Sequence, residues 1–141
     1  MSGRLAESTT QGRLAAVWFA GAAVVFLLLL VQTLTGKYGD HAGAAWGWLM
    51  PAILPTLSLI TGAIAYNASK PKRDTTVDRL AYRVALGLSV FYLALLLTTL
   101  LVEPLIRATP LQLLEMSDFW LGPVQGLVGL SLGAFFVSAR D

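Results

Sequence analysis

This sequence has no cysteine and few charged residues. None of its 141 residues is cysteine, which excludes disulfide bonds, thiolate metal ligands and a thiol nucleophile. Only 13% of the residues are charged, whereas a typical soluble domain carries about 25%. The formal net charge of +2 gives no indication of nucleic-acid binding. The chain is instead 56% hydrophobic, with a mean hydropathy of +0.69, and this balance predicts a membrane protein.

Long runs without any charged residue divide the chain. As helices rising 1.5 Å per residue, they are long enough to cross a hydrocarbon core about 30 Å thick. We predict an all-α fold, an integral membrane four-helix bundle made of two transmembrane hairpins joined by a basic hinge. The predicted spans cover residues 14–35, 48–66, 84–102 and 119–138, and the hinge covers residues 67–83.

The remaining segments lie outside the predicted spans. Residues 1–13 show no apolar period, so we predict a loose tail or the frayed start of a helix there. The segment 103–118 is not purely polar. Within it Thr109, Pro110 and Gln112 suit the N-cap, N1 and N3 positions, which predicts a short helix resting in the outer interface.

Lysine and arginine are distributed unevenly among the connections. Of the ten, only Lys37 and Arg107 fall in the two connections opposite the hinge. By the positive-inside rule, both termini and the hinge are predicted to be cytoplasmic, as in a multi-pass protein of a bacterial inner membrane. The C-terminal residues 139–141 belong to this cytoplasmic side.

Glycine recurs along the fourth predicted span. Gly122, Gly126, Gly129 and Gly133 are spaced four, three and four residues apart, so they share one side of a helix. Small residues at this spacing let two helix backbones approach closely in lipid. The favoured interpretation is packing against the first or second span of the same chain. Self-association between copies and a pore-lining strip are the alternatives.

The second predicted span carries a comparable stripe, formed by Pro51, Pro55, Ser58 and Gly62. Proline removes a backbone donor and bends a helix. Structural packing is the favoured interpretation of this stripe, and a proline bend used for gating is the alternative.

Polar residues within the spans are few. Gln32 and Gln125 both lie toward the outer half, and an amide in hydrocarbon needs a partner, so a hydrogen bond between them is one hypothesis. No span holds an ionisable residue in its middle, which argues against a proton-coupled transporter.

No catalytic or metal-binding cluster is visible. His41 is the single histidine, beside Asp40 in a glycine-rich connection, and the sequence places no third ligand or nucleophile with them. We therefore predict a protein that is not an enzyme and that needs neither cofactor nor metal.

The hinge concentrates positive charge at Lys70, Lys72, Arg73, Arg79 and Arg83. Its simplest role is to fix the topology. The same residues are candidates for binding anionic lipid or an acidic cytoplasmic partner. From these observations we predict a non-catalytic, self-associating membrane module, an anchor or subunit that acts through helix–helix contacts in the lipid bilayer. The alternative function is a small homo-oligomeric channel or membrane-permeabilising effector.

Overall fold

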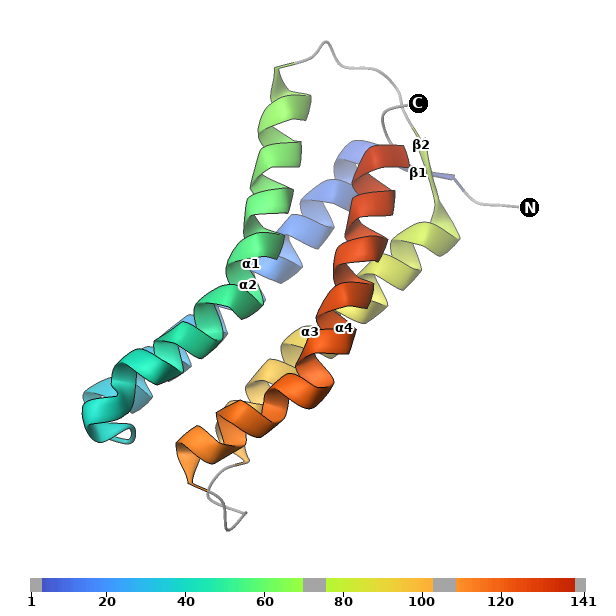
Figure 1. Cartoon of the computed structure of the whole chain (residues 1–141). Coiled ribbons are helices and arrows are strands. Elements are labelled where there is room, and N and C mark those ends of the chain that lie inside the picture. The colour runs from blue at the N-terminus through green and yellow to red at the C-terminus, as the bar shows by residue number, and fades with distance from the viewer. Residues whose placement is uncertain (1–3, 70–75, 103–108, 139–141) are drawn as a thin grey trace.

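Four long helices make up most of the computed structural model, which describes residues 4–69, 76–102 and 109–138. They are α1 (Glu7–Leu34), α2 (Ala42–Ala68), α3 (Arg79–Leu101) and α4 (Pro110–Ser138) (Figure 1). A short 3-10 helix, η1 (Gly39–His41), precedes α2. Two three-residue strands, β1 (Arg4–Ala6) and β2 (Thr76–Asp78), pair antiparallel. The predicted all-α fold with four helices is confirmed.

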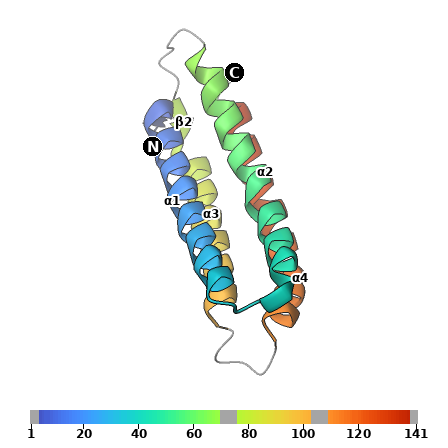
Figure 2. The same ribbon diagram turned by 90° about the vertical axis from the view of Figure 1, so that its left-hand side faces the viewer.

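The helices form two hairpins, α1–α2 and α3–α4, packed side by side. Helix α1 lies against α2 and α3, and helix α4 lies against the same two helices (Figures 1 and 2). Because each hairpin turns back at the same end of the bundle, α1 runs parallel to α3 and α2 runs parallel to α4. We name the end with the α1–α2 turn the outer end, after the predicted orientation, and the opposite end the inner end.

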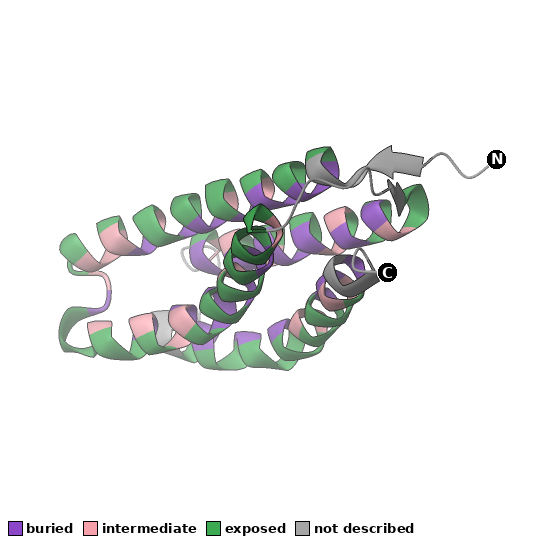
Figure 3. Ribbon diagram, turned by 90° about the horizontal axis from the view of Figure 1, so that it is seen from above, coloured by how far each residue is buried: buried purple, intermediate pink, exposed green. Residues whose placement is uncertain are grey.

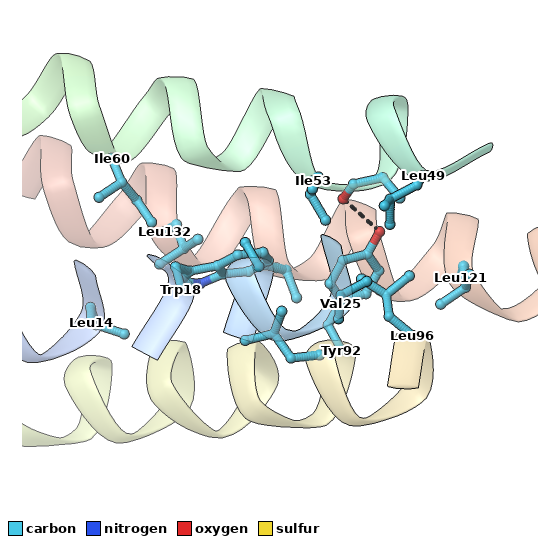
Figure 4. Close-up of a cluster of buried hydrophobic side chains, with 14 of the residues drawn as sticks. Leu14, Trp18, Val25, Leu49, Ile53, Ile60, Tyr92, Leu96, Leu121 and Leu132 are labelled. Atoms are coloured by element: carbon cyan, nitrogen blue, oxygen red, sulfur yellow. Dashed lines mark hydrogen bonds between the residues drawn. The ribbon is translucent and has the colours of Figure 1, made fainter. Parts of the chain in front are cut away.

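Apolar side chains fill the middle of the bundle and also cover its outside. Trp18, Tyr92 and Phe135 are the largest fully buried side chains, with leucines from all four helices around them (Figure 4). Many large apolar side chains face outward instead, among them Leu34, Phe119 and Leu130, which are 77%, 83% and 74% exposed. Figure 3 shows the exposed residues on the outside of every helix. Such a surface suits lipid rather than water.

Three helical segments are long and apolar enough to cross a membrane, judged among the described residues by length and composition. They are Thr9–Leu34, Gly39–Ala68 and Arg79–Leu101. The four α-helices contain 28, 27, 23 and 29 residues, so at 1.5 Å per residue they are about 35–44 Å long. Each therefore exceeds the apolar thickness of a bilayer.

The helices begin earlier than the uncharged runs suggested. Helix α1 begins at Glu7, inside the segment predicted as a tail. Helix α3 begins at Arg79, inside the predicted hinge, where the Asp78 carboxylate accepts a hydrogen bond from the Leu80 amide at 3.2 Å. Charged residues do not stop a helix where it leaves the hydrocarbon, so uncharged length underestimates helix length.

The prediction of a separate short helix within 103–118 is wrong, because Pro110 opens α4 and the helix continues without a break. Its capping residues are nevertheless those expected. The backbone N–H of Gln112 donates to the Thr109 hydroxyl at 3.3 Å, and the backbone N–H of Thr109 donates to the side-chain oxygen of Gln112 at 3.2 Å. This reciprocal pair is a capping box. Residues 103–108 lie outside the described residues.

One glycine brings two helices close together, and it is not one of those singled out from the sequence. A Cβ atom built on Gly21 of α1 would lie 2.5 Å from Cδ1 of Leu93 on α3. No side chain larger than hydrogen fits there unless Leu93 moves. At this position α1 and α3 lie in close contact.

The parallel helices α2 and α4 share a sequence pattern that matches their packing. Trp48, Leu49 and Pro51 of α2 recur in the same spacing on α4 as Trp120, Leu121 and Pro123. The buried positions follow the same register, and each member of the following pairs is buried: Ala45 and Ser117, Leu49 and Leu121, Thr56 and Val128, Ile60 and Leu132, Ala63 and Phe135. The two hairpins thus repeat one arrangement of their second helix. Both of these helices change direction part-way along their length (Figure 1).

Candidate functional site

The four glycines of α4 do not pack against any other part of the chain that the structure describes. A Cβ atom built on Gly122, Gly126, Gly129 or Gly133 would have no atom within 4 Å. The first three are exposed and Gly133 is half-buried. The favoured interpretation from the sequence, packing against the chain's own first or second helix, therefore finds no contact in the described residues. The two alternatives, contact between copies and a pore-lining strip, stay predictions.

The predicted stripe of α2 also lies on the outside. Pro51, Pro55, Ser58 and Gly62 are all exposed, and a Cβ atom on Gly62 would meet nothing within 4 Å. The core face of α2 is instead formed by residues between them, including Leu49, Thr56 and Ile60. Packing inside the bundle does not account for this stripe either.

A pocket opens between α2 and α4 near the outer end, with a volume of about 330 Å³. Its lining includes Pro51, the first member of the α2 stripe, together with the acidic side chains of Glu115 and Asp118 on α4. Gly122 follows these two acids by seven and four residues, which places all three on one side of α4. The pocket therefore lies at the outer end of the side of α4 that carries the four glycines.

Prolines in α2 leave carbonyl groups without their helical donors, and neighbouring helices bind there. Pro55 has no N–H to offer the Pro51 carbonyl, and the Gln125 amide of α4 donates to that oxygen at 2.9 Å. One residue further on, the Tyr92 hydroxyl of α3 donates to the Ala52 carbonyl at 2.9 Å, drawn as the dashed line in Figure 4. The bent part of α2 is thus held from two sides.

Gln32 has different partners, so the hypothesis of a Gln32–Gln125 hydrogen bond is wrong. Its amide nitrogen donates to the Leu100 carbonyl at 3.1 Å, and its amide oxygen accepts from the Tyr38 hydroxyl at 3.0 Å. The Lys37 ammonium donates to the same Leu100 carbonyl at 3.3 Å. Carbonyls in the last turn of a helix lack intrahelical donors, so this network caps α3 and secures the α1–α2 turn.

Of the hinge, residues 67–69 and 76–83 are described. Arg79 and Arg83 are exposed residues in the first turns of α3. Lys70, Lys72 and Arg73 lie outside the described residues. At the same inner end, the Asn67 side chain of α2 donates to the Gln11 side chain of α1 at 3.0 Å, and β1 pairs with β2. The side-chain bond closes the first hairpin at its inner end, and the strand pairing ties the start of the first hairpin to the start of the second.

The single histidine lies beside one acidic residue near the outer end of the bundle. His41 and Asp40 are exposed in η1, and the part of the chain that the structure describes contains no group of three or more histidine, aspartate or glutamate residues placed to hold a metal ion. Comparison with protein-family models, curated proteins and solved structures finds no match to this chain. A function must therefore be inferred from the geometry of α2 and α4.

Sequence reasoning missed two features of this site, and each left a signal. The repeated Trp-Leu-x-Pro pattern indicates that α2 and α4 are equivalent and lie at the same height. The need for a donor to the Pro51 carbonyl was also foreseeable, since a proline four residues later cannot supply an N–H. Gly21 gave no such signal, because it is an isolated small residue in an apolar run.

Proposed function

We propose that the protein is a non-catalytic membrane module whose four helices all cross the bilayer, with both termini on the cytoplasmic side, and that copies of it associate through the glycine-bearing side of α4. The observation that carries this proposal is the open space over Gly122, Gly126, Gly129 and Gly133. Glycine on a lipid-facing side contributes no apolar side chain to lipid contact. It does let a second helix approach closely, and van der Waals packing then stabilises the pair.

The neighbouring residues support a helix as the occupant. Leu127 and Leu130, which are 53% and 74% exposed, flank the glycines and offer large apolar side chains to a partner. In this proposal the second copy places its own α4 against these residues, as in the close crossings typical of small-residue motifs in membranes. The exposed Arg79 and Arg83 remain candidates for contact with anionic lipid or an acidic partner at the inner end.

The test compares two leucine substitutions in purified protein reconstituted into liposomes. Gly126→Leu is expected to abolish or weaken the oligomer, measured by single-molecule subunit counting, and to leave the helical content and the stability of the monomer unchanged. Gly62→Leu is the matched control, because it also adds a leucine to an open, exposed position. It should leave the oligomer intact.

A wild-type protein that is monomeric at every protein-to-lipid ratio would contradict the proposal. Ion and dye flux measured in the same liposomes tests the alternative function of a channel or permeabilising effector. Flux that depends on a defined oligomer would favour that alternative over a module acting only through contacts.

A further inference from the structure

The pocket between α2 and α4 combines an apolar wall with two acidic groups. Its lining consists of Ala44, Gly47, Trp48, Pro51, Leu114, Glu115 and Asp118. These residues include two carboxyl groups and no basic side chain. Charge complementarity therefore calls for a cation, and the apolar majority of the lining calls for one that is itself largely apolar.

One of the lining residues, Gly47, precedes a proline by four positions. The carbonyl of Gly47 would normally accept a hydrogen bond from the amide of residue 51, four positions later. Residue 51 is proline and has no N–H. Gly47, one of the lining residues on α2, therefore has a carbonyl that lacks its standard helical donor.

The indole of Trp48 is held in place at the side of the pocket. Its Nε1 donates to the Ser117 hydroxyl of α4 at 2.8 Å, and that hydroxyl donates to the Leu114 carbonyl at 2.6 Å. Ser117 is fully buried. Because the ring is fixed by α4 itself, its face is already positioned, and an aromatic face attracts an alkylated ammonium group.

We propose that this pocket binds the positively charged head of an amphiphilic organic cation, a quaternary ammonium group with a single alkyl chain. Glu115 and Asp118 balance the charge, and Trp48 contacts the N-methyl groups. The apolar chain leaves through the open side of the pocket into the surrounding lipid. A bare metal ion is disfavoured because it needs a closer set of oxygen ligands, and no cluster of three or more acidic or histidine side chains occurs in the described ranges 4–69, 76–102 and 109–138.

The inference goes beyond the proposed function, since it concerns the pocket near the outer end rather than the glycines of α4. The probe is decyltrimethylammonium, whose binding to the full chain in lipid nanodiscs is measured by isothermal titration. Decanol serves as the neutral probe and decyl sulfonate as the anionic one. The wild-type protein should bind the cation at least tenfold more tightly than either of the other two.

Three substitutions test the named groups, against one control. Asp118→Asn and Glu115→Gln should each weaken binding of the cation about threefold, because both side chains are exposed and solvent screens them. Trp48→Leu should have an effect of about the same size. Asp40→Asn removes an exposed acid from the same end of the protein but not from the pocket, and it should leave the affinity unchanged.

Several results would overturn the proposal. Equal affinity of the wild-type protein for the cation and for decanol is one, and that comparison needs no variant to fold. Another is an unchanged affinity in the double variant of Asp118→Asn and Glu115→Gln. A third is an equal loss in Asp40→Asn, which would assign the binding to general surface charge. Oligomer size, measured in parallel, reports on the proposed function independently.

Discussion

The hydrogen bond from Gln125 to the Pro51 carbonyl predicts a specific energetic coupling between α4 and the proline in α2. Replacing Gln125 by leucine puts an apolar side chain of comparable volume in its place and removes the side-chain amide that donates to that oxygen. Pro55 prevents α2 from supplying a replacement.

The expected cost of Gln125→Leu follows from these two facts. Hydrogen bonds between helices in membranes average about 0.6 kcal/mol and reach about 1.7 kcal/mol, and a carbonyl left without a partner costs about 1–3 kcal/mol. We therefore expect a loss of about 1–2 kcal/mol in the free energy of unfolding. In a Pro55→Ala background the residue 55 amide is restored and can bond to the Pro51 carbonyl, so the same change should cost less than about 0.5 kcal/mol.

The assay is a double-mutant cycle, with unfolding in mixed detergent and SDS micelles followed by circular dichroism. Ser131→Ala is the control on α4, since the Ser131 hydroxyl donates at 2.9 Å to Val128 of its own helix. It should show little loss and no coupling to Pro55→Ala. Should Gln125→Leu cost the same with proline and with alanine at position 55, the reasoning about the Pro51 carbonyl would be refuted.

Two further predictions concern packing and capping. Gly21→Leu should destabilise the protein by about 1–3 kcal/mol because the new side chain meets Leu93. Adding Leu93→Ala should recover part of that loss. Unfolding of the two single variants and the double variant measures both effects, and an undiminished loss in the double variant would contradict the contact. Thr109→Ala should cost about 1 kcal/mol by removing the capping box with Gln112, whereas Thr98→Ala, whose hydroxyl bonds within α3, should cost less; thermal unfolding distinguishes the two outcomes.

The number and order of the helices could be predicted from the sequence because a charged residue is expensive in hydrocarbon. Uncharged runs therefore locate each helix even without an amphipathic pattern. They do not locate its ends, as Glu7 and Arg79 show, since a helix continues into water wherever its residues allow. Cap residues are better guides to the ends, and Thr109 with Gln112 identified one correctly.

The side that a helix presents to its neighbours was harder to predict. Spacing places the α4 glycines on one side, but it does not say what that side meets. The rotation of α4 is set by larger side chains, with Leu121, Val128 and Leu132 turned to the core. In a soluble protein the apolar side would have revealed this rotation. Here the lipid-facing side is equally apolar, so hydrophobicity carries no information about direction.

Each hairpin starts and ends at the inner end of the bundle, so the chain can be divided between the two hairpins. The path of each hairpin does not depend on the other hairpin, because both hairpins return to the inner end. Two separately made polypeptides, one carrying α1 and α2 and the other α3 and α4, therefore have the topology needed to reassemble from fragments. The β1–β2 pairing and the Gly21–Leu93 contact would join them without a covalent link. The two hairpins therefore pack together as two different subunits would, although one polypeptide contains both.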